Sequence, residues 1–256
     1  TTELSEDIKE NHGQRDIIFA ANCICHIPDL DDTFKAVSNL LMPDGVFIFE
    51  DPSLAEMINN GSYDQIYDEH AHIFSVTALN NILLSKGIEI FRVQEMTVHG
   101  GSNRIYSCLA GSRRIEKSVY DHLEKERDSG LDNLSTYHLF SSRVHQSRDQ
   151  LINLLIELKR QGKKIISYGA TSKSTTVFNY CGITSELIDY IVDTTPSKQG
   201  KFSPGVHIPV ISPEEGLDKN VDYAFLGAWN FENEILSKEK DFTVNNRFIT
   251  HVPYVR

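Results

Sequence analysis

Two apolar strand patterns joined by one amphipathic helix pattern constrain the fold of the first fifty residues. Residues 15–23, RDIIFAANC, predict a fully buried strand of the kind found inside parallel sheets. Residues 26–41, HIPDLDDTFKAVSNLL, predict an amphipathic helix opened by proline and aspartate. Residues 42–52, MPDGVFIFEDP, predict a turn and a second buried strand. This strand–helix–strand order is typical of a parallel βαβ unit.

The same order returns after residue 160. Residues 163–169, KKIISYG, predict a strand, and residues 170–182, ATSKSTTVFNYCG, predict the helix that follows it. Residues 187–193, LIDYIVD, predict the next strand. Further strands are expected in VHIPVI and VDYAFLG, followed by a helix from about Asn230. The chain therefore contains a second α/β pattern.

The residues between these patterns predict further strands and helices. Residues 75–87, SVTALNNILLSKG, predict a helix that Ser75 caps and Gly87 ends. Residues 88–110 predict two strands around a Gly-Gly turn, and residues 141–161 predict one long helix within a charged, mostly helical region. We therefore expect an α/β protein with two lobes joined by a helical connector. The expected segments are 1–111, 112–160 and 161–256.

Composition and charge exclude several classes of protein. The chain of 256 residues is 40% hydrophobic and 24% charged, which is ordinary for a soluble globular protein. No apolar run approaches the roughly 18 residues of a membrane span, and the N-terminus has no signal-peptide pattern, so we expect a cytoplasmic location. The net charge of −11 opposes non-specific binding to nucleic acid. A few local cations still suffice to bind an anionic small molecule.

The cysteines predict buried thiols rather than a metal site. Only CICH, residues 23–26, is compact enough to indicate metal ligands, and no second cluster of cysteines and histidines completes a set of four. We therefore expect no metal in this chain. The better interpretation is a pair of small buried thiols at the end of a strand. The four cysteines are Cys23, Cys25, Cys108 and Cys181.

The segment 62–75, SYDQIYDEHAHIFS, contains more ionisable groups than an ordinary core element. Within it, Tyr67, Glu69 and His70 combine a phenol, a carboxylate and an imidazole. A histidine with a near-neutral pKa, oriented by a carboxylate, is suited to removing a proton from carbon beside a carbonyl group. The alternative is a polar loop whose histidines cap neighbouring backbone.

Asn22 and His26 follow the first predicted strand directly. In open α/β sheets, ligands bind beyond the carboxyl ends of the strands, so this position favours a site. Alternatively, His26 only begins the helix that follows.

The segment 167–176, SYGATSKSTT, predicts a turn from strand to helix that contains Gly169 and Lys173. Backbone N–H groups at a helix N-terminus, together with a lysine, are suited to binding an anion, although the segment is not a P-loop. The loop 193–205, DTTPSKQGKFSPG, adds Lys198 and Lys201 to this prediction. Alternatively, it is a basic, solvated loop.

The segment 98–106, VHGGSNRIY, places Gly100, Gly101 and Arg104 at a hairpin. It is either a tight turn only or a turn that brings backbone and arginine close to a ligand.

In their order along the chain, these segments resemble the S-adenosylmethionine-dependent sugar C-methyltransferases, which methylate nucleotide-linked keto-deoxysugars. That family has a zinc-binding domain, a central Rossmann lobe and a C-terminal Rossmann-like lobe. The zinc domain and the front half of the central lobe, with its glycine-rich cofactor loop, have no counterpart here. The matching stretches are AANCICHIPDLDD, LLMPDGVFIFEDPSL, SYDQIYDEHAHIFS, HGGSNRIY, GATSKSTTVFNYCGI and DTTPSKQGKFSPGVHIPV.

The resemblance implies a fold and a set of site residues. The fold would be the back half of a methyltransferase Rossmann lobe followed by a complete second lobe. His70 resembles the family's proposed base, with Tyr67 and Glu69 beside it. His26 corresponds to an active-site histidine, and Asn22 would lie near the methionine end of the cofactor. The implied substrate-binding residues are Gly101, Arg104, Gly169, Thr171, Lys173, Lys198 and Gly205.

The expected function is a sugar C-methyltransferase, or the part of one that binds substrate and supplies the catalytic base. The expected cofactor is S-adenosylmethionine, with zinc only if an upstream domain exists, and the expected partner is a nucleotide-linked keto-deoxysugar. Three explanations fit the absence of counterparts to the family's first segments: a truncated chain, a split protein and a degenerate relative. A further expected partner is therefore a missing N-terminal segment or a complementary chain. The alternative is a non-catalytic module that binds sugar nucleotides. A nicotinamide-dependent oxidoreductase fits poorly, because Asp193 is its sole candidate for binding ribose.

Overall fold

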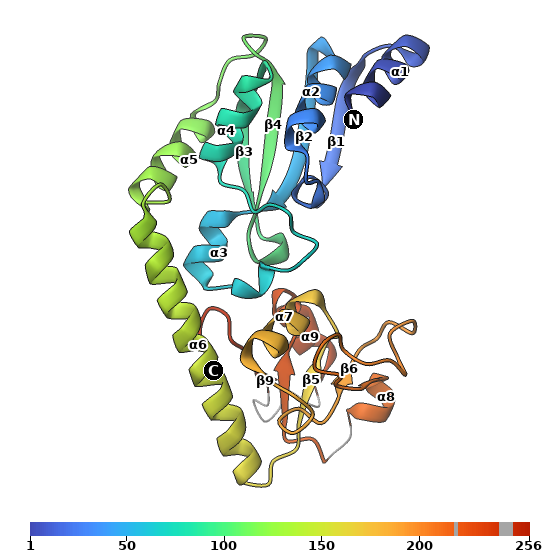
Figure 1. Ribbon diagram of the computed structural model, residues 1–256, viewed down its shortest axis with the longest axis vertical. Coiled ribbons are helices and arrows are strands. Elements are labelled where there is room, and N and C mark those ends of the chain that lie inside the picture. The colour runs from blue at the N-terminus through green and yellow to red at the C-terminus, as the bar shows by residue number, and fades with distance from the viewer. Residues whose placement is uncertain (218–219, 241–247) are drawn as a thin grey trace. The chain divides into compact units, whose positions relative to one another are not determined.

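The computed structural model describes residues 1–217, 220–240 and 248–256, and the chain forms two compact units (Figure 1). Unit 1 comprises Thr1–Ile58 and Asp68–Tyr137, and unit 2 comprises Asn59–Tyr67 and His138–Arg256. One boundary between the units therefore falls inside the ionisable segment 62–75. The division into three segments at residues 111 and 160 stays a prediction.

A four-stranded mixed sheet forms the centre of unit 1. Its strands lie in the order β1-β2-β4-β3, with β1 parallel to β2 and the other neighbours antiparallel. Helix α2 (Leu30–Leu40) connects β1 to β2, so the predicted βαβ unit is confirmed. The strands are β1 (Arg15–Ala21), β2 (Leu41–Pro52), β3 (Ile88–Met96) and β4 (Ser102–Leu109).

The prediction that the first strand is fully buried is wrong. Strand β1 is the edge of its sheet and pairs with β2 alone among the described strands. Ile17 and Phe19 are 66% and 60% exposed. An apolar run alone does not distinguish a central strand from an edge strand whose one face lacks a cover. Helix α1 (Thr2–His12), which the sequence did not predict, packs against α2.

Aromatic packing fixes α2 against the sheet of unit 1. The ring of Phe34 in α2 lies 6.3 Å from the rings of Phe47 and Phe49 in β2, and those two rings stack at 4.9 Å. All three side chains are buried, and burial of each contributes about 1.5–3 kcal/mol.

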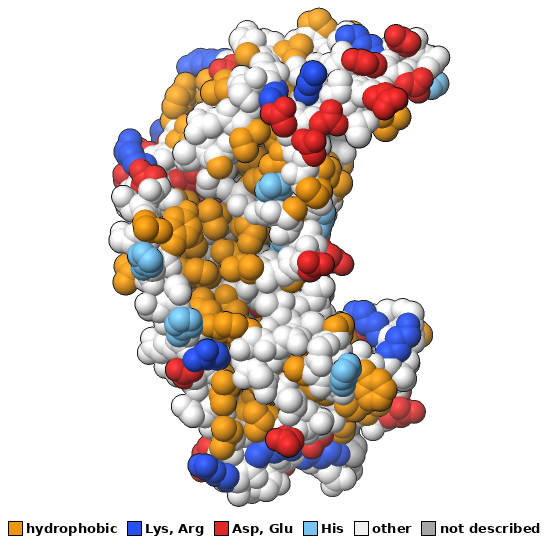
Figure 2. Space-filling view, in the orientation of Figure 1, with side chains coloured by type: hydrophobic (Ala, Val, Ile, Leu, Met, Phe, Trp, Pro, Cys, Tyr) orange, Lys and Arg blue, Asp and Glu red, His pale blue; other side chains and the backbone are white. Residues whose placement is uncertain are grey.

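Helices α4 (Val76–Ser85) and α5 (Lys117–Asp128) pack against β3. The side chain of Ser75 caps α4 and Gly87 follows its end with a φ of 71°, as predicted. Acidic side chains gather over α1, on the other side of this unit (Figure 2).

The buried carboxylate of Glu126 in α5 caps the N-terminus of α4. Glu126 Oε1 accepts a hydrogen bond from Val76 N at 2.7 Å, and Oε2 accepts bonds from Thr77 N at 2.8 Å and Thr77 Oγ1 at 2.6 Å. A carboxylate at this position also interacts favourably with the helix dipole. This cap fixes the end of the segment 62–75.

Unit 2 contains a five-stranded, fully parallel sheet. The strand order β7-β6-β5-β8-β9, numbered within this unit, is 3-2-1-4-5, which matches the first five strands of the classic Rossmann order 3-2-1-4-5-6. The predicted second Rossmann-like lobe is therefore confirmed. Strand β9 was not predicted. The strands are β5 (Ile165–Tyr168), β6 (Ile191–Val192), β7 (Val210–Ile211), β8 (Tyr223–Leu226) and β9 (Phe248–Ile249).

Helix α6 (Leu134–Arg160) is the predicted long helix, and it contributes residues to both units. Helix α7 (Ser172–Cys181) follows β5 and ends at Gly182, whose φ is 66°. No helix in the described part of the chain has both the length and the apolar character needed to cross a membrane. The shorter helices are α3 (Leu54–Asn60), α8 (Pro213–Gly216) and α9 (Glu232–Lys238).

Replacing Glu126 by alanine should destabilise unit 1. The substitution leaves the amides of Val76 and Thr77 without their acceptor, which costs about 1–3 kcal/mol of the free energy of unfolding. Glu124→Ala is the matched control, because Glu124 is exposed and pairs only with Arg127 among the described residues. Urea unfolding followed by circular dichroism measures both variants. Equal midpoints for the two variants would contradict the capping role.

Candidate active site

The carboxyl ends of β1 and β2 bring together the candidate site residues of unit 1. Because β1 and β2 are parallel, their carboxyl ends lie next to each other on the same side of the sheet. There, Asn22 N donates a 2.7 Å hydrogen bond to Glu50 O. The next residue of β2, Asp51, accepts a 3.3 Å hydrogen bond on Oδ1 from Cys25 N. The turn after β1 is therefore fastened to the end of β2.

Asn22 turns the chain with a left-handed backbone, at a φ of 50°. Asparagine is one of the few residues other than glycine that adopts this conformation readily. Its side-chain Oδ1 is buried and accepts no hydrogen bond from any described residue. A buried acceptor without a donor is unusual in folded proteins, so this atom fits a ligand that brings a donor.

His26, Glu69 and His70 lie together beyond β1. His26 Nδ1 is 2.6 Å from Glu69 O, and the rings of His26 and His70 are 5.1 Å apart between their centroids. A carbonyl oxygen only accepts hydrogen bonds, so Nδ1 of His26 carries a proton and Nε2 is the basic nitrogen of the neutral ring. Glu69 contributes its backbone to this contact, while its side chain is exposed. Tyr67 is half-buried and belongs to unit 2.

Cys25 and Asp51 lie buried next to this pair of histidines, at 1% and 3% exposure. Cys23 is exposed, so the prediction of two buried thiols is wrong for Cys23 and confirmed for Cys25. Burial raises the pKa of the Asp51 carboxyl, and hydrogen bonds from Cys25 oppose the shift only in part. Burial and the neighbouring Asp51 raise the pKa of the Cys25 thiol, which is therefore neutral. Ligand atoms of Cys25, His26 and His70 all lie within 4.8 Å of one another. The sequence indicated only CICH as compact, because His70 is distant along the chain.

The hairpin residues Gly101 and Arg104 have structural partners within unit 1. Arg104 Nε donates a 2.9 Å hydrogen bond to Oε2 of the buried Glu50, its neighbour across the β2–β4 pair, and Nη2 forms an ion pair with the same oxygen at 2.7 Å. Gly101 has a φ of 117°, and a Cβ there would lie 2.7 Å from the Cβ of Glu56. A role for either residue in binding substrate stays a prediction.

In unit 2, the turn between β5 and α7 brings together Gly169, Thr171 and Lys198. Gly169 has a φ of 96°, and Thr171 caps α7 by accepting a 3.0 Å hydrogen bond from Ser174 N. Lys198 Nζ donates a 2.7 Å hydrogen bond to Ala170 O. The loop after β6 therefore reaches the N-terminus of α7.

Asp193 lies at the same turn, where its Oδ2 accepts a 2.7 Å hydrogen bond from Ala170 N. Burial raises the pKa of Asp193, but hydrogen bonds from Thr195 and Ala170 outweigh burial and lower it. The carboxylate is therefore charged. It is engaged in holding the turn rather than offered to a ribose.

Lys173 is the second residue of α7, and Gly205 lies in the loop between β6 and β7. Lys173 is 8% exposed, and burial lowers the pKa of its ammonium group while the charge of Asp64 opposes that shift. Gly205 packs against the side chain of Asn179, which would clash with any Cβ at that position. Asn179 is in the second half of α7, roughly 10 Å from the helix start at 1.5 Å per residue. Their predicted contact with substrate is untested by this geometry.

A buried polar cluster in unit 2 was not predicted. Asp64 Oδ2 accepts a 2.6 Å hydrogen bond from Trp229 Nε1, and Asp64 Oδ1 lies 3.7 Å from His251 Nε2. Asp64 and His251 are almost completely buried, and the ring of Tyr63 lies 5.2 Å from that of His251. The first half of the segment 62–75 therefore anchors unit 2, while the second half carries His70 in unit 1. The density of ionisable residues was the only signal in the sequence.

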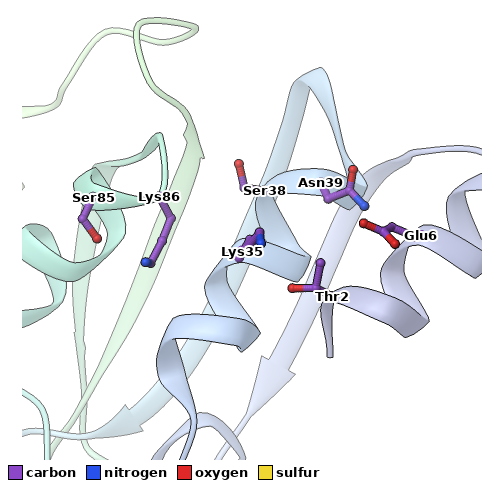
Figure 3. Close-up of a pocket in the computed structure, with 7 residues that line it drawn as sticks. All are labelled: Thr2, Glu6, Lys35, Ser38, Asn39, Ser85 and Lys86. Carbon is purple, nitrogen blue, oxygen red and sulfur yellow. The ribbon is translucent and has the colours of Figure 1, made fainter.

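Figure 3 shows a polar pocket of about 480 Å³ in unit 1, remote from the carboxyl ends of the strands. Its lining includes the last turn of α2 and the end of α4, just before β2 and β3 begin. Open α/β sheets bind ligands at the carboxyl ends of their strands, whereas this pocket lies at the other end, so we assign it no catalytic role. It is lined by Thr2, Glu6, Lys35, Ser38, Asn39, Ser85 and Lys86.

Replacing Asp64 by alanine should destabilise unit 2. The substitution removes the acceptor of Trp229 and the compensating charge near Lys173, at a cost of about 1–3 kcal/mol. Asp68→Ala is the control, because Asp68 is exposed in the same segment. Urea unfolding followed by the fluorescence of Trp229, the only tryptophan, measures both variants. An unchanged midpoint in Asp64→Ala would refute the anchoring role.

Comparisons with known proteins identify the family of this chain. A family model described as "C-methyltransferase C-terminal domain" matches residues 97–253, and one described as "Methyltransferase domain" matches residues 1–93. C-methyltransferase NovU from Streptomyces niveus is 36% identical over 258 residues, which cover 100% of this chain and 61% of that relative. The chain therefore spans 61% of the length of the curated relative that it matches.

Among solved structures, a crystal structure of the M1.HpyAVI–SAM complex is 10% identical, with a TM-score of 0.28, and the match covers 43% of this chain and 50% of that one. This similarity is too low to support an argument. The family models and the curated relative carry the conclusion. The chain belongs to the C-methyltransferase family.

Proposed function

We propose that this chain supplies the proton-transfer and substrate-binding residues of an S-adenosylmethionine-dependent sugar C-methyltransferase. The methylated atom would be the carbon next to the ketone of a nucleotide-linked deoxysugar. The observation that carries this proposal is the pair of imidazoles, His26 and His70, 5.1 Å apart beyond the carboxyl ends of β1 and β2. Membership of the C-methyltransferase family and the similarity to NovU support the reaction class.

His70 would act as the general base. Its imidazole removes the proton from the substrate carbon, so that a C–H bond breaks and an N–H bond forms, and the electron pair moves toward the ketone oxygen. Tyr67 or His26 would donate a hydrogen bond to the developing enolate oxygen. The proton on Nδ1 of His26 is already donated to Glu69 O, so His26 can stabilise that oxygen only with a second proton on Nε2.

Asn22 would hold the methionine end of the cofactor. Its buried Oδ1 lacks a donor within the described residues, and the ammonium group of S-adenosylmethionine would supply one. When bound, S-adenosylmethionine supplies an electrophilic methyl group. The position of Asn22 at the end of β1 agrees with the usual location of ligands in open α/β sheets.

The turn at the start of α7 would bind the diphosphate of the sugar nucleotide. Thr171 caps this helix, and Lys198 brings a positive charge to the same turn, where its Nζ also lies 3.5 Å from the carboxylate of Asp193. Basic side chains gather over the loop that follows β6 (Figure 2). Gly169 would permit close approach of the backbone. The remaining proposed substrate contacts are Gly101, Arg104, Lys173 and Gly205.

Replacing His70 by alanine should abolish exchange of the substrate proton. General-base catalysis contributes on the order of 10²–10⁴-fold in rate, so deuterium incorporation from D₂O beside the ketone of a dTDP-4-keto-deoxysugar should slow by that factor. Nuclear magnetic resonance of the sugar measures the exchange. His72→Ala is the matched control, because Nε2 of His72 lies 3.2 Å from Pro28 O and His72 is outside the histidine pair. Undiminished exchange in His70→Ala would refute the role of His70.

Replacing Lys198 by alanine should weaken nucleotide binding at least about tenfold. A hydrogen bond to a charged group is worth about 1.5–3 kcal/mol, and the charge at the turn is lost as well. Calorimetric titration with dTDP measures the affinity. Lys201→Ala is the control, because Lys201 lies in the same loop and is exposed. Equal losses in the two variants would point to general charge attraction instead of a site at α7.

The same titration separates catalysis from simple binding. Binding of a dTDP-sugar together with S-adenosylmethionine, followed by methyl transfer, agrees with the enzyme. Binding of the nucleotide alone agrees with a non-catalytic module that holds sugar nucleotides.

A further inference from the structure

Cys25, His26 and His70 have the composition of a transition-metal site. One ligand atom from each residue lies within 4.8 Å of the other two. One thiolate sulfur and two imidazole nitrogens are the donor set that Zn²⁺ and Co²⁺ prefer, whereas Mg²⁺ and Ca²⁺ prefer oxygen. Around a tetrahedral zinc ion, with Zn–S of about 2.3 Å and Zn–N of about 2.0 Å, such atoms lie roughly 3.5 Å apart. The three side chains therefore need to move inward by only about 1 Å.

A hydrogen bond outside this cluster fixes the orientation of one of its histidines. Donation of Nδ1–H by His26 to Glu69 O fixes the ring and leaves Nε2 as its basic nitrogen. A backbone carbonyl in this position is the usual outer partner of a metal-binding histidine. Three protein ligands would leave the fourth position open to water or to a ligand.

Asp51 gives an independent indication that a positive charge fits here. Its carboxylate is 3% exposed, and its Oδ2 accepts no hydrogen bond from the described residues, although the group lies against Cys25. A divalent cation next to Cys25 would compensate this buried oxygen. The sulfur of Cys25 favours cations with a strong preference for sulfur ligands.

We propose that Cys25, His26 and His70 form a binding site for a thiophilic divalent cation of the Zn²⁺ class. Such a cation would engage both imidazoles and prevent His70 from accepting the substrate proton, so it inhibits the reaction and is not a cofactor. This second part rests on the proposed function. The binding itself does not.

Titration of the whole chain with Co²⁺ tests the binding part without any substrate. Thiolate coordination produces a charge-transfer band in the near ultraviolet, and tetrahedral cobalt produces visible bands. We expect both in the unaltered chain. We expect Cys25→Ser to lose the charge-transfer band and Cys23→Ser to retain it, since Cys23 is exposed and outside the cluster.

The histidines provide a second pair of matched variants. His26→Ala and His70→Ala should each weaken cobalt binding at least tenfold, whereas His72→Ala should not. His26 is exposed, so its replacement tests the site even if Cys25→Ser does not fold. The proposal is overturned if the unaltered chain shows no charge-transfer band. Loss of the band in Cys23→Ser, with retention in Cys25→Ser, also overturns it.

Proton exchange with and without Zn²⁺ tests the inhibitory part. We expect Zn²⁺ to slow exchange in the unaltered chain and to have at least tenfold less effect on Cys25→Ser, relative to the metal-free rate of each protein. Exchange that is unaffected by bound metal overturns the inhibitory part. A cobalt band in a protein that never exchanges the substrate proton would refute the proposed function and leave the cation site in place.

Discussion

The candidate site depends on the parallel pairing of β1 with β2. The carboxyl ends of parallel strands lie on the same side of the sheet. The 2.7 Å hydrogen bond from Asn22 N to Glu50 O continues the pairing of β1 with β2 past the end of β1. The turn that follows carries Cys25 and His26, and the side chain of Asp51 at the end of β2 holds that turn by accepting a hydrogen bond from the backbone N–H of Cys25. Without this parallel pairing, residues from three separate stretches of sequence would not meet.

Much of the fold was predictable from the sequence, because hydrophobic periodicity reports local structure well. The βαβ unit, the hairpin, the helix capped by Ser75 and the parallel second lobe all followed from patterns within single segments. The burial of β1 did not, since exposure of Ile17 and Phe19 depends on which strands flank them. Helix α1 has a polar composition and gave no apolar period to detect.

The site was predictable in part. The order of the motifs indicated His26 and His70, and the structure brings these two rings to 5.1 Å. The cap on α4 by Glu126 and the buried contact of Asp64 with Trp229 were not predictable, because both join residues far apart in sequence. The dense ionisable segment therefore has two tasks. Its first half is a buried anchor, and its second half is the loop that carries the imidazole.

The unpaired side of β1 has a consequence for how the sheet of unit 1 can be extended. Only one side of β1 forms a ladder with another described strand, so the outward N–H and C=O groups are a template for hydrogen bonding with a further strand. Ile17 and Phe19 are also exposed on this edge strand. A further strand that extended the sheet of unit 1 on this side would lie along β1, next to the turn that carries Asn22 and His26.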